Sequence, residues 1–286
     1  MPQRLIPPRF RRVNSSDGVE VAIHDLAGHD GDRPVLLISH ATGFHGYCYQ
    51  PMAEALATRF HSIAFDYRGH GDTSQPVEVA VDWNRYADDA EAVALTLTRP
   101  LAGFGHSMGG ACLLITAHRH PQLFSHLVLY EPIVFTPDVA SEAGRTPQLA
   151  EGARRRRSTF PSFDAAIANF AAKPPLGQFT PAALEAYVRH GFAEGEDGQV
   201  HLKCRPEQEA ATFEMAERQD TWELLPEITV PVIVVCGALA PDSPARFSQG
   251  VAERLPNGRY LQIDELDHLG PMTHPEMVAG LIEAAL

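Results

Sequence analysis

Ser107 lies at the centre of a G-x-S-x-G pattern, the segment GHSMG at residues 105–109. A serine hydroxyl becomes a nucleophile when a nearby base takes its proton, and histidine often supplies that base. The two glycines fit a sharp turn from a strand into a helix, which raises the serine above the sheet at the positive end of the helix. The pattern predicts attack by Ser107 on an acyl carbon. The fourteen histidines form no HExxH or comparable pattern, so we expect no metal site.

Short apolar runs alternate with helix-length segments on both sides of Ser107. The runs lack polar alternation, which is typical of a parallel sheet covered on both faces. We expect strands at residues 34–39, 61–66, 101–105 and 126–130, and helices at 49–59, 83–98 and 108–120. This alternation predicts βαβ units, and therefore an α/β fold with a mostly parallel, doubly wound sheet.

Residues 133–225 carry helix signals, such as the Thr180-Pro181 start, but no convincing core strand. The alternation of strands and helices then resumes. We expect strands at residues 230–236 and 259–263 and helices at 243–255 and 274–286. One α/β core, residues 1–132 and 226–286, is therefore predicted to be interrupted by a helical cap, residues 133–225. We expect this cap to cover the carboxyl edge of the sheet, where ligands bind in open α/β folds.

The charge composition indicates which classes of binding partner the chain avoids. Among 286 residues, 23 Lys and Arg stand against 36 Asp and Glu, which gives a formal net charge of −13. Such a field repels polyanions, so we expect neither nucleic acid nor an anionic membrane surface as a partner. No secretory segment or apolar run of membrane-spanning length is apparent, and the four cysteines form no CxxC pair. A cytoplasmic location with reduced thiols is expected. Nothing indicates the oligomeric state.

Four segments carry a family resemblance. They are Ser39–Gly43 (SHATG), Asp66–Asp72 (DYRGHGD), Gly105–Gly110 (GHSMGG) and Asp267–Pro271 (DHLGP). With them the chain resembles the α/β-hydrolase superfamily, in its serine-nucleophile branch of esterases and lactonases, over nearly its whole length apart from the helical insertion. The resemblance implies the α/β-hydrolase fold with a cap, and no cofactor.

The resemblance also implies a catalytic triad. Its base would be His268, in the loop after the last predicted strand. The acid of this family usually lies three residues after the glycine that follows the preceding strand, but here that position is Ala240, which cannot accept a hydrogen bond. Glu131, directly after the strand at 126–130, is the favoured acid, because haloalkane dehalogenases and zearalenone lactonases carry theirs there. Asp242 is the alternative acid, although it is also placed to cap a helix. An incomplete triad is the third alternative.

Backbone donors for the oxyanion follow from the same resemblance. They would be the N–H groups of Thr42 and Met108. Ala41 departs from the family, since relatives often carry glycine there. Asp66 and Asp72 precede the elbow and are expected to support its structure.

Aromatic residues before and within the cap predict an apolar pocket. Phe44, Tyr47 and Tyr49 lie near the oxyanion loop, and eight more aromatic residues lie between 160 and 222. Four consecutive arginines, Arg154–Arg157, could clamp an anionic substrate, but such a run wraps around a helix, so most of it must be solvated.

These residues favour a serine hydrolase acting on a carboxylic ester or lactone of a largely apolar small molecule. Ser107 excludes the chemistry of relatives that use an aspartate nucleophile, such as epoxide hydrolases. Carbon–carbon bond hydrolysis, thioester hydrolysis, perhydrolysis and acyl transfer would use the same machinery. A weakly catalytic ligand-binding protein remains an alternative from a different class.

Overall fold

An eight-stranded sheet forms the centre of the computed structural model, which describes residues 10–28, 32–74, 80–136, 146–240 and 243–286. Six neighbouring strands are parallel, and β2 runs antiparallel to both of its neighbours. In spatial order the strands are β1 (Phe10–Asn14), β2 (Glu20–Ala27), β4 (His61–Phe65), β3 (Val35–Ser39), β5 (Leu101–His106), β6 (Phe124–Tyr130), β10 (Val232–Cys236) and β11 (Gly258–Gln262). Every residue of β3 and β5 is buried, as expected for central parallel strands.

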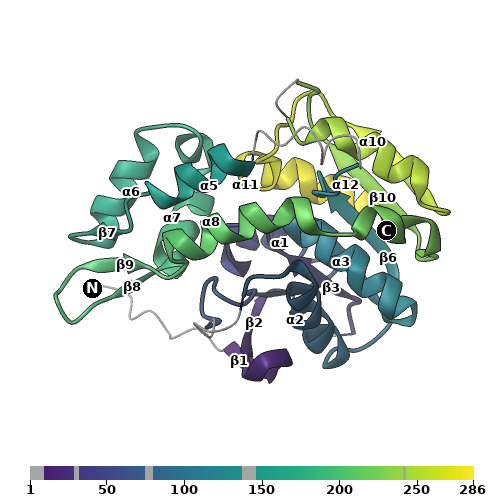
Figure 1. Ribbon diagram of the computed structural model, residues 1–286, viewed down its shortest axis with the longest axis horizontal. Helices are drawn as coiled ribbons and strands as arrows, with labels where there is room; N and C mark the ends of the chain where they lie inside the picture. Colours follow the sequence, from purple (N-terminus) through teal and green to yellow (C-terminus); the bar gives the residue numbers. More distant parts are fainter. Residues whose placement is uncertain (1–9, 29–31, 75–79, 137–145, 241–242) are drawn as a thin grey trace.

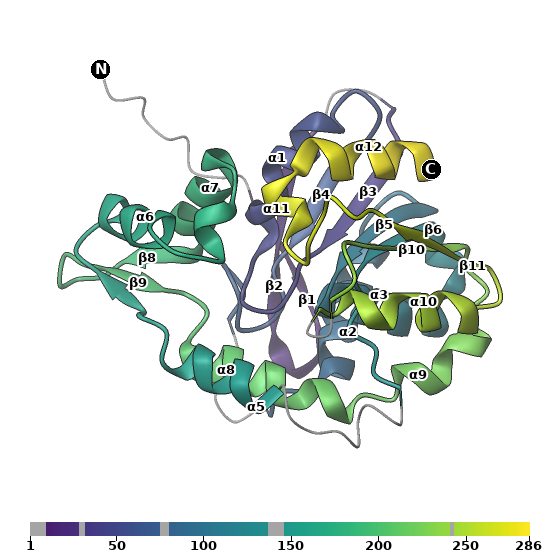
Figure 2. The same cartoon turned by 90° about the horizontal axis from the view of Figure 1, so that it is seen from above.

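Helices cover both faces of the sheet (Figure 2). One face carries α1 (Gln50–Ala55), α11 (Gly270–Thr273) and α12 (Pro275–Ala285), and the other carries α2 (Trp83–Leu95), α3 (Met108–Arg119) and α10 (Ala245–Arg254). Each face has its own cluster of buried apolar side chains against the sheet. The α/β fold with a mostly parallel, doubly wound sheet is therefore confirmed.

The segment between β6 and β10 packs on both sides of the core, and its described residues include five α-helices. These are α5 (Thr146–Arg154), α6 (Phe163–Ala171), α7 (Pro181–Gly191), α8 (Pro206–Met215) and α9 (Thr221–Leu224). Figure 1 shows α6 and α7 extending to one side of the sheet, while α8 runs alongside α5. Aromatic side chains of this segment join the apolar cluster of the α1 and α12 face. On the other side, Trp83 Nε1 of α2 donates to the Thr212 carbonyl of α8 over 3.0 Å.

Short strands also occur in this segment, in which the sequence shows helix signals but no convincing core strand. A small antiparallel sheet is formed by β7 (Thr159–Phe160), β9 (Val200–Leu202) and β8 (Phe192–Glu194), in that order. Strands of two or three residues are too short to show a period of two, so no sequence pattern reveals them. The segment is thus mostly helical and carries a small sheet at its outer end (Figure 1).

No helix within the described ranges is both long and apolar enough to cross a lipid bilayer.

Candidate active site

Ser107 occupies the turn between β5 and α3. Its backbone has φ 55° and ψ −120°, a conformation that residues other than glycine rarely adopt. The flanking glycines permit this turn because backbone atoms approach them closely. A Cβ on Gly105 would lie 2.7 Å from the Cα of Gly110, and a Cβ on Gly109 would collide with the Ser39 carbonyl oxygen. The segment thus has the geometry of a nucleophile elbow.

We expect Gly109→Ala to destabilise the fold, because the added methyl group meets the backbone of β3 and has no flexible neighbour to displace. Overpacking of this kind costs about 1–3 kcal/mol of unfolding free energy. Urea denaturation measures the loss. Gly152→Ala in α5 is the matched control, because its Cβ would meet nothing within 4 Å and alanine favours a helix by about 0.5–1 kcal/mol. Equal stabilities of the two variants would contradict the close approach at Gly109.

Glu131 lies directly after β6 and is fully buried. Its Oε2 accepts a hydrogen bond from His268 Nδ1 over 2.7 Å, and its Oε1 accepts from the Gly237 N–H over 2.9 Å. The residue has φ 44°, a left-handed conformation that is uncommon for a side-chain-bearing residue. Both carboxylate oxygens are therefore held, and one of them fixes the ring of His268 with its proton on Nδ1.

The sheet places Ser107 and Glu131 at the same level, directly after the neighbouring strands β5 and β6. His106 pairs with Tyr130 in the register of β5 and β6, and the Ser107 N–H donates to the Tyr130 carbonyl over 3.0 Å. Within the described residues Ser107 Oγ makes no hydrogen bond to His268. Such bonds are often long in unliganded sites and tighten when substrate binds.

A chain of hydrogen bonds joins Ala41, Tyr49, His106 and His268 around Ser107. The Ala41 N–H donates to the Tyr49 hydroxyl over 3.1 Å, and that hydroxyl donates to His106 Nδ1 over 2.8 Å. The other ring nitrogen, His106 Nε2, donates to the His268 carbonyl over 2.8 Å. Burial, together with the nearby His268, lowers the pKa of His106 well below its usual value, so its ring stays neutral. The sequence does not reveal Tyr49 and His106 as supports of the site, because no motif contains Tyr49 and the G-x-S-x-G pattern accepts any residue at the position of His106.

Two backbone N–H groups lie beside the elbow. Within the part of the chain that the structure describes, neither the Thr42 N–H nor the Met108 N–H is hydrogen-bonded to protein, although both residues are buried. The Thr42 hydroxyl lies 3.4 Å from the sulfur of Met108, which brings the two segments together. Ala41 fits this loop because the left-handed position is Gly43, with φ 76°. The pair forms a candidate oxyanion hole.

His40 braces the loops instead of facing Ser107. Its Nδ1 donates to the Ala41 carbonyl over 2.8 Å, and its Nε2 accepts from the Tyr67 N–H over 3.0 Å. Burial and the neighbouring His70 lower the pKa of His40 to about 3. Burial likewise lowers the pKa of His70 to about 4. Both rings are therefore neutral in the folded protein at neutral pH.

These two histidines predict an acid-sensitive fold. In the unfolded chain they bind protons below about pH 6.5, whereas in the folded chain they cannot, so the free energy of unfolding falls as the pH falls. His40 and His70 together contribute a loss of about 2 kcal/mol between pH 6 and pH 5, because a tenfold difference in proton binding is worth about 1.4 kcal/mol. The buried His106 adds to this loss in the same direction, so the measured loss should be at least this large. Urea unfolding at both pH values measures it. The slope should persist in His118→Gln, which changes a histidine paired with Glu227 at the far end of α3. A free energy that does not change between pH 6 and pH 5 would refute it.

Asp66 holds neighbouring loops together through its hydrogen bonds and is not placed to act as the acid of the candidate site. Its carboxylate accepts from the backbone N–H groups of Gly46 and Asp72 over 2.7 and 2.8 Å, and from His24 over 2.7 Å. Burial alone would raise the pKa of Asp66, but His24 holds it far below its usual value. His24, Asp66 and Asp72 are near enough to share a cation. However, the Lys203 ammonium lies 2.6 Å from Asp72 and supplies a positive charge there.

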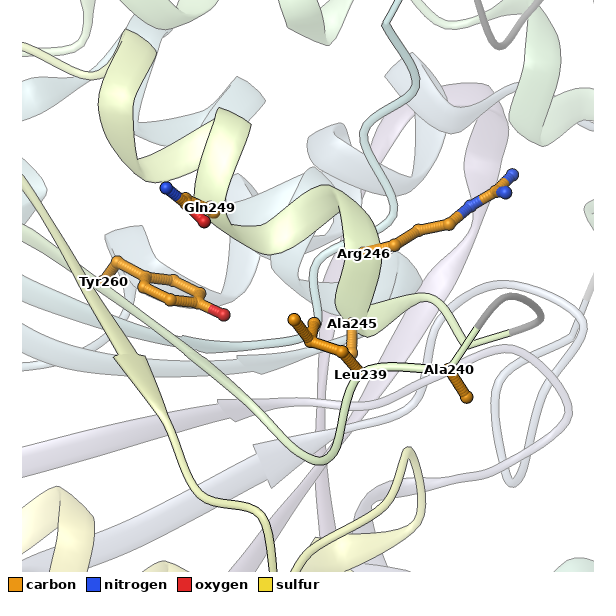
Figure 3. A pocket seen from close by; sticks show the side chains of 6 residues that line it. All are labelled: Leu239, Ala240, Ala245, Arg246, Gln249 and Tyr260. Carbon is orange, nitrogen blue, oxygen red and sulfur yellow. The ribbon is translucent and has the colours of Figure 1, made fainter.

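A surface pocket of about 450 Å³ lies elsewhere, beside α10 (Figure 3). Its lining is Leu239, Ala240, Ala245, Arg246, Gln249 and Tyr260. None of Ser107, Glu131 or His268 lines it, so this pocket is separate from the candidate active site. Ala240, the position where the family usually carries its acid, is exposed at the edge of this pocket. The alternative acid, Asp242, lies outside the described residues.

Known proteins match this chain over most of its length. The model of the α/β hydrolase family matches residues 35–281. The chain is 28% identical over 211 residues to 2-(acetamidomethylene)succinate hydrolase of Mesorhizobium japonicum, covering 72% of this chain and 71% of the relative. It is 25% identical over 281 residues to 3-oxoadipate enol-lactonase 2 of Acinetobacter baylyi, covering 98% of each. The crystal structure of E-2-(acetamidomethylene)succinate hydrolase matches with a TM-score of 0.80 at 23% identity, over 96% of this chain and 97% of that one.

Proposed function

Because the chain belongs to the α/β hydrolase family, we propose that it is a serine hydrolase that cleaves a carboxylic ester or a lactone of a largely apolar small molecule. That it is a hydrolytic enzyme follows from the family and its named relatives. The bond between Glu131 and His268 is the observation that carries the ester or lactone proposal, because it holds an imidazole in the tautomer of a general base. An enol-lactonase among the relatives supports the same class of substrate.

In the proposed reaction Ser107 Oγ attacks the ester carbonyl while His268 Nε2 takes its proton. Glu131 accepts from Nδ1–H and stabilises the imidazolium. The negative charge on the carbonyl oxygen is stabilised by the N–H groups of Thr42 and Met108. The tetrahedral intermediate then expels the alcohol oxygen, which takes the proton from His268 Nε2. The products of this half are an acyl-Ser107 ester and an alcohol, which stays attached to the acyl group when the substrate is a lactone.

Water completes the reaction. It gives one proton to His268 Nε2 and adds to the acyl carbon through the same oxyanion intermediate. Collapse of this intermediate returns the proton to Ser107 and releases the carboxylic acid. Phe44, which follows Gly43 and is only partly buried where it packs on the core cluster of the α1 and α12 face, supplies apolar surface for the acyl part.

A hydrolysis panel tests this proposal. It contains neutral methyl and p-nitrophenyl esters of increasing acyl length together with five- and six-membered lactones. We expect turnover of at least one ester or lactone, abolished by stoichiometric reaction with a fluorophosphonate. Turnover of none of them, with fluorophosphonate still labelling Ser107, would favour carbon–carbon cleavage, thioester hydrolysis or acyl transfer. Absence of labelling in the folded protein would favour a ligand-binding role.

A further inference from the structure

One of the four consecutive arginines differs from its neighbours in its surroundings. Arg154 and Arg155 pair with Glu214 and Glu151 at the surface, with side chains 46% and 76% exposed. Arg156 is only 20% exposed, and its Nη1 donates to Glu209 Oε2 over 2.8 Å. The run therefore places one guanidinium inside the protein.

This buried ion pair lies against the oxyanion loop. Glu209 belongs to α8, and its carboxylate fills the space over Gly43, where a Cβ would overlap it. Gly43 directly follows Thr42, one of the two proposed oxyanion donors. Arg156 is thus connected, through Glu209, to the loop that would hold the reacting carbonyl.

Tyr187 adds a polar group without a partner. The residue belongs to α7 and is 1% exposed, and within the described residues its buried hydroxyl makes no hydrogen bond. Its ring packs edge-on against Phe44 of the oxyanion loop, with centroids 5.7 Å apart. Phe44 is the residue next to Gly43, over which the Glu209 carboxylate lies, so the tyrosine ring and the ion pair meet at the same loop. Burial raises the pKa of the Tyr187 hydroxyl, which therefore keeps its proton. An unsatisfied buried hydroxyl in a native fold calls for an explanation, and a ligand group is one.

The chemistry of the cluster suits an anion. A guanidinium offers five N–H donors, and within the described part of the chain Arg156 uses one of them. Glu209 orients the group and leaves donors for a second, bidentate carboxylate. A buried ion pair adds little net stability, so stability alone does not account for it. Because the net charge of −13 repels anions in general, a carboxylate would need such a local cation.

We propose that Arg156, together with the Tyr187 hydroxyl, binds a carboxylate carried by the substrate at the far end of an apolar spacer. The substrate class is then a monoester or lactone that bears one free carboxylate. This inference rests on the proposed function, since it assigns the substrate of the same site.

The test compares monomethyl esters of four- to seven-carbon dicarboxylic acids with methyl esters of the monocarboxylic acids of the same length. We expect kcat/KM to be at least about tenfold higher for the charged ester at the best length. Arg156→Met should lower kcat/KM for this ester by about 100-fold and for its neutral match by less than about threefold. Arg155→Met, the control in the same run, should change neither. Equal losses for the two esters, or no loss, would overturn the assignment.

Two further variants separate binding from folding. Arg156→Met leaves Glu209 buried and unpaired, so the double change Arg156→Met/Glu209→Gln removes both charges and should show the same selective loss. Tyr187→Phe keeps the ring, and should raise KM for the charged ester by about three- to tenfold with kcat and thermal stability unchanged. A hydroxyl with a structural role alone would leave KM unchanged.

Calorimetric binding of the free diacids, glutarate first, reports on Arg156 without turnover. We expect wild-type protein to bind the diacid of the best length and Arg156→Met to bind it at least tenfold more weakly. Binding that depends on Arg156 without hydrolysis of any ester would overturn the proposed function and keep the anion site. Hydrolysis of neutral esters with no diacid binding would overturn the anion site and keep the proposed function.

Discussion

His268→Gln is expected to lower kcat by about 10⁶-fold, the size of effect that follows loss of the base of a serine triad. Glutamine at this position can still donate to Glu131, but it cannot take the proton of Ser107 at neutral pH. The oxyanion donors would remain, so a residual rate of about 10³-fold over the uncatalysed reaction is expected. Steady-state kinetics on the best ester of the panel, with a circular dichroism melt to check folding, gives the result.

The control for this variant is His118→Gln. His118 lies ten residues after Met108, the first residue of α3, about 15 Å along the helix at 1.5 Å per residue, and it pairs with Glu227. We expect its kcat to stay within about twofold of wild type, as for most surface substitutions. If His268→Gln kept kcat within tenfold of wild type, another histidine would have to be the base.

Glu131→Gln is expected to lower kcat by about 10⁴-fold while the protein stays folded, as when the acid of a serine triad becomes an amide. The glutamine oxygen can still accept from the Gly237 N–H, but its NH₂ group faces His268 Nδ1. The imidazole would then turn to the tautomer with a proton on Nε2, which cannot accept the proton of Ser107. The measurement is kcat on the same ester, with KM expected to change little.

Asp242→Asn is the comparison that decides the acid. We expect kcat within about threefold of wild type, because Glu131 already accepts from His268 at 2.7 Å. The opposite pattern, a collapse in Asp242→Asn with near-normal turnover in Glu131→Gln, would reassign the acid to Asp242.

Much of the core was predictable because its strands are continuous apolar runs. The parallel strands at 34–39, 61–66 and 101–105 correspond to β3, β4 and β5, with ends that shift by one residue. The antiparallel β1 and β2 were not identified individually, since polar residues such as His24 and Asp25 interrupt their pattern. Tertiary contacts hold such residues in a strand: His24 is buried against Asp66.

In the candidate site too, residues marked by a local pattern were predictable and residues placed by tertiary contacts were not. Ser107 follows from a local motif, and Glu131 follows from chain position, since a residue after β6 must lie beside the elbow after β5. Their catalytic roles stay predictions. The hydrogen bond between Tyr49 and His106 could not be foreseen from spacing, because the two residues are 57 positions apart in the sequence. The burial of Arg156 likewise depends on how the cap packs over the oxyanion loop.

Covalent modification of Ser107 by a slow ester tests the central claim most directly. Wild-type protein would be incubated with p-nitrophenyl dimethylcarbamate, whose carbamoyl-serine product hydrolyses slowly, and then analysed by intact mass and peptide mapping. We predict one carbamoyl group per chain on the peptide that contains Ser107, one equivalent of released nitrophenol, and neither in Ser107→Ala or His268→Gln. A carbamoyl group on another residue, or ester turnover by Ser107→Ala at the wild-type rate, would contradict a reaction through Ser107.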